Sequence, residues 1–173
     1  DGDTSNNKPV NDPAILAKAQ YYGGDIKGIT QKIKAGYFQD LGINTIWISP
    51  ITQNPIDAWG QFNDPETKFS GYHGYWPITS TSVDYRLGNS ADVKEMLRTA
   101  HSNGLSVLLD YVANHVHEQH AVYQKHKDWV TPLYLLDGTM NTEKWDEHRL
   151  TTWFDTFLPT LDLEKQEVTD FMV

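Results

Sequence analysis

Three polar residues with different chemistries follow one apolar segment of the chain. Residues 105–109 are mostly aliphatic, and Asp110, Asn114 and His115 come directly after them. An aliphatic run without alternation predicts a strand that is buried on both faces of a parallel sheet. Because ligands of parallel α/β folds bind at the carboxyl ends of the strands, these side chains are candidates for a functional site. The alternative is structural: Asp110 caps a turn, and His115 is a satisfied core histidine.

A second candidate lies in segment 51–88, which is too long for a simple connection and is therefore expected to be a functional loop. At its centre, residues 71–76 read Gly-Tyr-His-Gly-Tyr-Trp. Glycines beside aromatic residues allow backbone conformations that present the rings at unusual angles. The chain also holds six Trp, nine Tyr and six Phe, several of them beside Gly, Asn or Asp in expected loops. This pattern favours a surface that stacks against sugar rings, although many of the aromatic residues must belong to the core.

The N-terminal residues 1–12 are rich in hard oxygen donors. Asp1, Asp3, Asn6 and Asn7 offer carboxylate and amide oxygens at close spacing. Ca²⁺ prefers such ligands, although the spacing is not that of an EF-hand. A solvated, turn-rich segment explains the same composition, so both interpretations stay open at this point.

The segment after the predicted strand offers a third kind of chemistry, because His115, His117, Glu118 and His120 are close together. Imidazoles two positions apart suit a strand and more widely spaced ones suit a helix, which is a zinc-binding pattern. No further carboxylate arrangement supports a zinc hydrolase, so this is the least favoured alternative.

Alternating helices and strands are expected to position these residues. The expected elements are a helix over 26–41, a strand over 44–49, a helix from its N-cap Ser90 to its terminator Gly104, and a strand over 105–109. This order predicts a parallel sheet or a (β/α)₈ barrel. Residues 116–157 interrupt the order, since they are polar and aromatic and show no clear period. We expect them to form an irregular excursion, followed by a short helix from about Leu163.

The composition excludes several classes of protein. The 173 residues carry a net charge of −9 and contain no cysteine. A nucleic-acid partner is not expected without a basic surface, and disulfides and thiolate metal sites are excluded. No apolar run approaches the roughly 18 residues that a membrane span needs, and no signal-peptide pattern is recognisable. The acidic balance fits a protein that binds cations or a neutral substrate.

Taken together, four motifs resemble the α-amylase family of glycoside hydrolases. Residues 110–115 resemble the first signature of the family, and residues 71–76 resemble its substrate loop. Residues 1–7 together with Gly23-Gly24-Asp25 resemble the calcium loop of cyclodextrin glucanotransferases and related bacterial α-amylases, and residues 158–162 are similar to the motif that closes the inserted B domain. The resemblance implies an α/β fold: the N-terminal part of a (β/α)₈ TIM barrel with an irregular B domain, incomplete as given. The implied parts are barrel residues 1–112, a B-domain-like excursion over 113–162, and the start of the next barrel helix over 163–173.

The resemblance also implies roles for individual residues. Tyr75 would stack on a sugar ring, and His73 and Trp76 would line the neighbouring subsite. His115 would hydrogen-bond a ring hydroxyl, and Asp110 would hold the geometry of the site, so both would support catalysis. The implied Ca²⁺ ligands are Asp1, Asp3, Asn6, Asn7, Gly23 through its carbonyl, and Asp25, with Asn114 at a second calcium ion. Thr160 stands where many amylases carry an aspartate ligand of that second ion, which puts the second site in doubt.

The implied function is retaining hydrolysis of internal α-1,4-glucosidic bonds in starch and maltooligosaccharides. The nucleophile and the general acid are expected beyond the end of this chain, in the rest of a secreted or periplasmic parent polypeptide. The nearest alternative is a cyclodextrin glucanotransferase or maltogenic amylase. Thr156 stands where the glucanotransferases carry a large aromatic residue, which favours a hydrolase. An alternative of another class is a non-catalytic, calcium-stabilised carbohydrate-binding protein.

Overall fold

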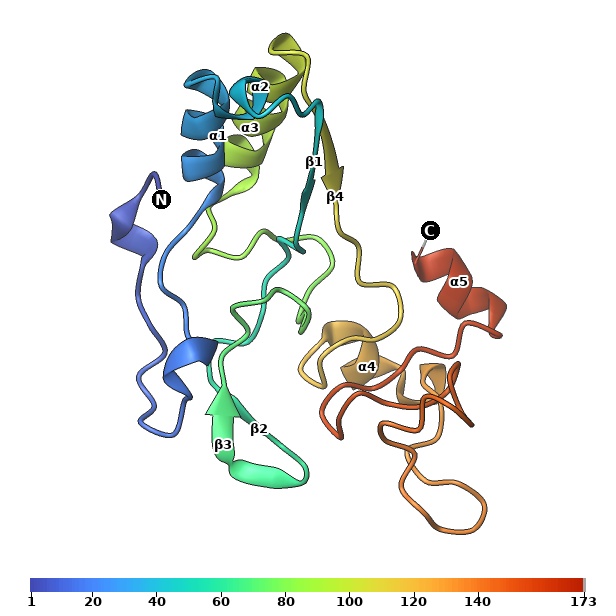
Figure 1. Ribbon diagram of the computed structural model, residues 1–173. Helices are drawn as coiled ribbons and strands as arrows, with labels where there is room; N and C mark the ends of the chain where they lie inside the picture. Colours follow the sequence, from blue (N-terminus) through green and yellow to red (C-terminus); the bar gives the residue numbers. More distant parts are fainter. Residues whose placement is uncertain (173) are drawn as a thin grey trace.

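The computed structural model describes residues 1–172 and is organised around a pair of parallel strands with helices beside them (Figure 1). The elements of this unit are α1 (Ile26–Lys34), α2 (Tyr37–Asp40), β1 (Thr45–Ile48), α3 (Ser90–Ser102) and β4 (Ser106–Leu109). Thr45 lies opposite Ser106 and Ile48 lies opposite Leu109, with α3 connecting the two strands. This parallel β-α-β arrangement confirms the predicted alternation. The predicted burial of the second strand on both faces is wrong for these residues, because Leu108 and Leu109 are 54% and 43% exposed.

Hydrophobic residues at helical spacing hold α1 and α3 together. Ile26 and Ile33 of α1 and Met96 and Ala100 of α3 are buried in one cluster, which Leu105 completes at the start of the second strand. The cluster lies on one side of the strand pair, where Figure 1 places the helices. Burial of each large aliphatic side chain stabilises the fold by about 1.5–3 kcal/mol.

Two predicted helix boundaries are wrong, each for a local reason. The expected single helix over 26–41 is two helices, because Gly36 adopts a left-handed conformation with φ of 76° between α1 and α2. Helix α3 begins one residue earlier than predicted, since Asn89 and not Ser90 is the N-cap. The Asn89 side chain accepts from the amide of Ala91 at 2.8 Å, and the Asp92 carboxylate accepts from the amide of Asn89 at 3.0 Å. This reciprocal capping box satisfies amides that the helix leaves free.

The expected long loop over 51–88 contains an antiparallel hairpin, which the sequence analysis missed. Its strands are β2 (Trp59–Gln61) and β3 (Asp64–Phe69), with an irregular register after Gly60. Charged residues and a proline in the second strand obscure any alternating pattern. The hairpin extends from the end of the molecule opposite α1, α2 and α3 (Figure 1).

Residues 116–157 form the irregular excursion that was predicted, around a second small core. The short elements here are α4 (Ala121–Lys125) and the 3₁₀ turn Lys127–Trp129, and two further 3₁₀ turns lie near the N-terminus at Thr4–Asn6 and Ala17–Ala19. Val116, Val122 and Leu161 pack together with Val168 of α5 (Gln166–Met172). Helix α5 therefore begins slightly later than the predicted Leu163. An isolated bridge between His115 and Thr160 closes the excursion at its base.

Candidate functional site

The 71–76 loop and the end of β4 meet at a hydrogen bond between Tyr75 and Asp110. The Asp110 amide still belongs to the strand ladder, because it donates to the carbonyl of Ile48 at 2.9 Å. One carboxylate oxygen of Asp110 accepts from the Tyr75 hydroxyl at 2.8 Å. This hydrogen bond to Asp110 raises the pKa of Tyr75, which keeps the phenol protonated. Two motifs that are distant in the sequence therefore form one site.

His115 fixes the backbone of Tyr75. Its Nε2 atom lies 2.9 Å from the Tyr75 carbonyl, and its Nδ1 atom lies 3.3 Å from the side-chain amide of Asn114. A carbonyl oxygen can only accept, so Nε2 carries the proton and Nδ1 accepts from Asn114. Burial lowers the pKa of His115, which favours this neutral form. Both ring nitrogens are thus used within the protein, and the structure makes His115 a positioning residue for Tyr75.

His73 supports Tyr75 from the other side. Its Nδ1 atom accepts from the Tyr75 amide at 3.0 Å, and the two rings stack with centroids 6.0 Å apart. Burial lowers the pKa of His73 to about 4, with a smaller contribution from His115. The Tyr75 side chain nevertheless remains 42% exposed. Its ring is therefore held in place and still open to a ligand.

Trp76 lies beneath the site and not on its surface. Its ring is 9% exposed and packs against Phe157 at a centroid distance of 5.1 Å and against His73 at 4.8 Å. Trp76 therefore packs beneath the loop, and its predicted role in lining a subsite stays a prediction.

The structure also brings in Asn54, a residue that the sequence analysis missed. Asn54 is 1% exposed and accepts from the Trp76 amide at 2.7 Å, while its own amide donates to the carbonyl of Gly74 at 3.1 Å. Gly74 has φ of 87°, and a Cβ atom there would lie 2.4 Å from the carbonyl oxygen of Pro50. The 71–76 loop thus packs on the segment that follows β1, and the hydrogen bonds of Asn54 hold the loop in place. Only the dipeptide Asn54-Pro55 in a polar loop could have drawn attention to this residue.

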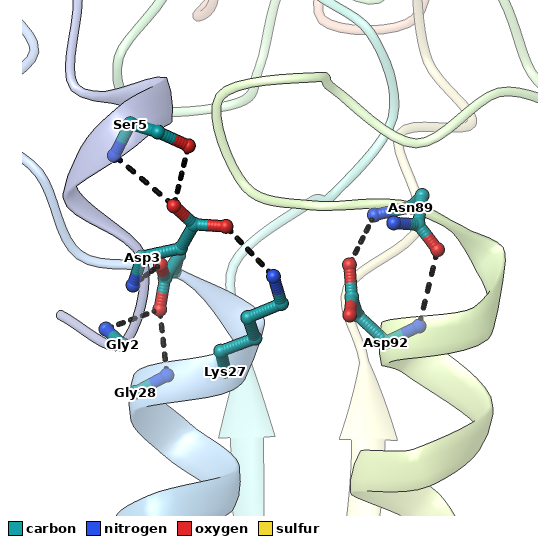
Figure 2. A network of polar contacts seen from close by, with 8 residues as sticks. Gly2, Asp3, Ser5, Lys27, Gly28, Asn89 and Asp92 are labelled. Atoms are coloured by element: carbon teal, nitrogen blue, oxygen red, sulfur yellow. Dashed lines mark hydrogen bonds and ion pairs between the residues drawn. The ribbon is translucent and has the colours of Figure 1, made fainter.

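The N-terminal loop is fastened to the first turn of α1 by Asp25. Figure 2 labels Gly2 and Gly28, two of the residues whose amides bind this carboxylate. The Asp25 carboxylate accepts from the amides of Gly2 at 2.8 Å, Asp3 at 2.7 Å and Gly28 at 2.6 Å. Asp25 is therefore the N-cap of α1 and the anchor of the loop. The Asp3 carboxylate binds Lys27 at 2.7 Å and also accepts from Ser5, and these contacts hold the pKa of Asp3 well below its usual range.

Two of the other predicted calcium ligands have buried side-chain oxygens that accept no hydrogen bond within the described residues. The side-chain oxygens of Asn6 and Asn7 are buried and have no hydrogen-bond partner within residues 1–172. The amide of Asn7 contacts the Asp1 carboxylate. Gly23 lies against both side chains, since a Cβ atom there would be 2.7 Å from Asn7 and 2.9 Å from Asp1. Buried amide oxygens without donors, beside a carboxylate, are the kind of donor set that fits a hard cation.

At Asn114 and Thr160, the positions of the second implied calcium site, the structure shows hydrogen bonds that involve backbone groups. The Thr160 hydroxyl donates to the carbonyl of Thr152 at 2.8 Å, and the carbonyl of Asn114 accepts from the Leu161 amide at 2.9 Å. The part of Asn114 as a calcium ligand stays a prediction.

The histidines of the zinc alternative do not converge on one point. Nε2 of His120 lies 3.1 Å from the hydroxyl of Ser80, whereas His117 packs among aromatic rings, 4.5 Å from Trp59. His115 faces Tyr75. The three side chains therefore have separate structural partners, and the zinc alternative gains no support.

The fold and the site define part of a (β/α)₈-barrel protein. Two parallel strands are joined by a helix, polar and aromatic side chains lie at the carboxyl end of one strand, and an irregular excursion follows it. Residues 1–161 match the family model described as the catalytic domain of α-amylase. The chain belongs to the α-amylase family. Among residues 1–172, no helix combines the length and the apolar character needed to cross a membrane.

Several relatives and solved structures are similar to this chain. The periplasmic α-amylase of Escherichia coli is 38% identical over 97 residues, which are 55% of this chain and 14% of that protein. A cyclomaltodextrin glucanotransferase of Klebsiella oxytoca is 34% identical over 170 residues, covering 91% of this chain and 24% of that protein. The crystal structure of an α-amylase from Geobacillus thermoleovorans in complex with acarbose superposes with a TM-score of 0.68 and 33% identity, covering 94% of this chain and 32% of that one. The chain thus spans about a quarter or less of these curated relatives.

Proposed function

We propose that this chain forms the sugar-binding part of the active site in a retaining glycoside hydrolase that cleaves internal α-1,4 bonds of starch and maltooligosaccharides. The observation that carries the proposal is the exposed ring of Tyr75, which Asp110, His115 and His73 hold at the carboxyl end of β4. A fixed aromatic ring offers an apolar face to a sugar ring at little cost in conformational entropy.

In this proposal the chain orients the substrate and does not break the bond itself. Retaining hydrolysis needs a carboxylate nucleophile and a carboxylic acid about 5–5.5 Å apart. Asp110 supports Tyr75 through its hydrogen bond, and we assign it no direct attack on the sugar. The reacting carboxylates would belong to the remainder of a longer enzyme, which fits the small share of its relatives that this chain covers.

Hydrolysis is favoured over cyclisation by the residues near the end of the excursion. A cyclising enzyme of this family would present a large aromatic ring at about position 156. Thr156 instead hydrogen-bonds the Asp155 carboxylate through its amide at 2.6 Å, and the neighbouring Phe157 is 5% exposed. Neither residue offers an exposed ring around which a glucan could curl, and the nearest exposed ring along the chain, that of Phe154, packs against His115.

The test uses the complete protein that carries this chain, incubated with soluble starch. We expect reducing sugar to be released, with the new anomeric carbon in the α configuration when the products are followed by NMR before mutarotation. Cyclic products in place of linear ones would select the glucanotransferase. Saturable binding of maltoheptaose without any product would select the non-catalytic carbohydrate-binding protein.

We propose in addition that Ca²⁺ binds in the N-terminal loop and stabilises it. The ligands would be the side-chain oxygens of Asn6 and Asn7, the Asp1 carboxylate and the carbonyl of Gly23. Asp3 and Asp25 would fasten the loop around the ion, because their carboxylates already accept hydrogen bonds from the loop and from α1. The support is the pair of buried amide oxygens that lack donors within the described residues.

Asn6→Ala tests this calcium site. The variant should melt several degrees below the wild type in excess Ca²⁺ and at the same temperature in a chelator, because binding at a hundredfold excess over Kd stabilises by about 2.7 kcal/mol. Differential scanning calorimetry of the complete protein measures both conditions. Asn11→Ala is the matched control, since Asn11 is exposed in the same segment. Equal shifts of Asn6→Ala with and without Ca²⁺ would contradict the site. Asp25→Ala is less suitable, because it also removes the N-cap of α1.

We also propose that the parent protein is secreted or periplasmic, which the name of the E. coli relative supports. Fractionation of cells that express the complete protein with its natural N-terminus would test this.

A further inference from the structure

Two exposed aromatic rings of the excursion lie next to the site described above. Trp145 and Phe154 are 36% and 45% exposed, and their ring centroids are 4.4 Å apart. The Phe154 ring also packs against His115 at a centroid distance of 4.8 Å. Because His115 binds the carbonyl of Tyr75, a continuous path of contacts connects this aromatic pair with Tyr75.

A buried polar network holds the two segments that carry these rings. Asn141 and Thr152 are 1% and 0% exposed, and the Thr152 hydroxyl donates to the carbonyl of Asn141 at 3.2 Å. The same hydroxyl accepts from the amide of Lys144 at 2.9 Å, directly before Trp145. The amide of Trp153 donates to the carbonyl of Asn141 at 2.9 Å, directly before Phe154. The network thus fixes the backbone on the N-terminal side of each ring.

A strained residue turns the chain toward Trp145. Glu143 has φ of 54°, and within residues 1–172 it is the only residue other than glycine with positive φ. Its amide donates to the carbonyl of Trp153 at 2.9 Å, so the surrounding structure holds it in this conformation. Left-handed backbone costs a non-glycine residue about 1–2 kcal/mol, and such strain is typically retained at functional sites. The strained backbone at Glu143 therefore lowers the stability of the excursion, and the fixed backbone holds the aromatic pair in one arrangement.

The surroundings of the pair fit a sugar better than a protein surface. Glu143, Asp146 and Glu147 are exposed beside Trp145, and Lys144 is half-buried. Carboxylates and an ammonium group can hydrogen-bond sugar hydroxyls, whereas an apolar protein partner would have to desolvate them. Aromatic rings with charged side chains around them suit a ligand that is apolar on its faces and polar at its edges.

We propose that Trp145 and Phe154 form an additional glucosyl-binding platform, which binds a sugar unit of a maltooligosaccharide beyond the one that stacks on Tyr75. This inference rests on the proposed function, because it takes the ligand at Tyr75 to be an α-1,4-glucan. The platform makes the excursion a determinant of chain-length preference. Short substrates that occupy only the units around Tyr75 do not reach it, and longer ones do.

The experiment compares a long and a short substrate on the complete protein. Trp145→Ala should lower kcat/KM for maltoheptaose by about tenfold, the upper range for loss of one aromatic contact. Phe154 is left unchanged in this comparison, because its ring packs against His115, which positions Tyr75. The value for the shortest maltooligosaccharide that the wild type cleaves should fall less than about twofold, because that substrate makes no contact with the pair. Leu150→Ala is the control, since Leu150 is 81% exposed on the same excursion and is not in the pair.

A second pair of variants separates stacking from folding. Trp145→Phe keeps an aromatic face and should retain most of the activity on maltoheptaose, whereas Trp145→Leu should not, with equal melting temperatures for both. An equal loss on long and short substrates, or no loss on either, would overturn the platform. Failure of the proposed function is seen separately, because the wild type would then cleave no α-glucan at all.

Discussion

Replacing Tyr75 with alanine in the complete protein is expected to lower kcat/KM for starch by about 100-fold, with little change in melting temperature. The Tyr75 side chain is 42% exposed, so its loss leaves no large cavity in the core. What is lost is the ring against which the sugar is proposed to stack and the hydrogen bond that ties this ring to Asp110. Initial rates of reducing-sugar release and a thermal melt measure the two effects.

Tyr75→Phe separates the two contributions of this side chain. It keeps the aromatic face and removes only the hydroxyl that donates to Asp110 at 2.8 Å. The aromatic face is kept and only an exposed hydrogen bond that orients the ring is lost, so a fall of about tenfold, smaller than that of Tyr75→Ala, is expected. Tyr134→Ala is the control for losing an exposed tyrosine elsewhere, since Tyr134 is 58% exposed in the excursion. If Tyr75→Ala keeps more than a tenth of the wild-type activity, the stacking role is wrong.

The parallel unit of the fold could be predicted because its signals are local. The aliphatic run after Leu105, the helical spacing of Ile26 and Ile33, and the terminating Gly104 each predict their element without knowledge of the rest. The family motifs then placed Tyr75 and Asp110 in one site, and the structure brings them within hydrogen-bond distance.

The missed hairpin and the missed role of Asn54 share a physical cause, which is that a non-local contact decided the outcome. The hairpin β2–β3 has no alternating pattern, and Trp59 is held by packing against Phe157 and His117, far along the chain. Asn54 matters only because the 71–76 loop folds back over it, and its partners are backbone groups, which carry no signal in the sequence. The burial of Trp76 likewise depends on Phe157, which the excursion supplies from far along the chain.

The predicted calcium ligands differ in whether their side-chain oxygens already accept hydrogen bonds from the protein. A carboxylate at the start of a helix can cap the helix or bind an ion, and residue type alone does not distinguish the two. Asp25 caps α1, and its pattern in the sequence equally suits that role. The asparagines differ, because their side-chain oxygens find no donor among the described residues.

His117 connects the excursion to the chain that follows the 71–76 loop. Its amide donates to the carbonyl of Pro77 at 3.0 Å, and its ring packs among aromatic side chains. It is 0% exposed, and its ring lies 4.5 Å from Trp59 and 5.4 Å from Phe157, measured between centroids. Its Nδ1 atom accepts from the amide of Gln119 at 3.1 Å, so the proton is on Nε2, which has no acceptor within residues 1–172. A charged imidazolium has no counterion in this aromatic cluster, and burial lowers the pKa of His117 to about 4.

Acidification should therefore destabilise the excursion through His117. The pKa is about 4 in the folded protein and 6.5 for an unperturbed histidine, so between these values the unfolded chain binds more protons. The free energy of unfolding then falls as the pH drops from about 6.5, and the loss is complete near pH 4, at ~3 kcal/mol for this one group. His117→Phe keeps an aromatic ring of similar shape and cannot be protonated. Its free energy of unfolding should therefore fall less than that of the wild type over the same range, and urea denaturation at pH 7, 5.5 and 4.5 measures the difference.

The comparison isolates His117 from other groups that titrate in this range. Burial also lowers the pKa of His73 to about 4 and that of His115, and carboxylates contribute in both proteins, so only the difference between variant and wild type is informative. His101→Ala is the control for removing a histidine elsewhere, because His101 is exposed on α3 and lies outside the aromatic cluster. If His117→Phe loses as much stability in acid as the wild type, His117 is protonated in the folded protein. The aromatic cluster would then have to open or admit water, and it could not hold Trp76 beneath Tyr75 as rigidly as the structure indicates.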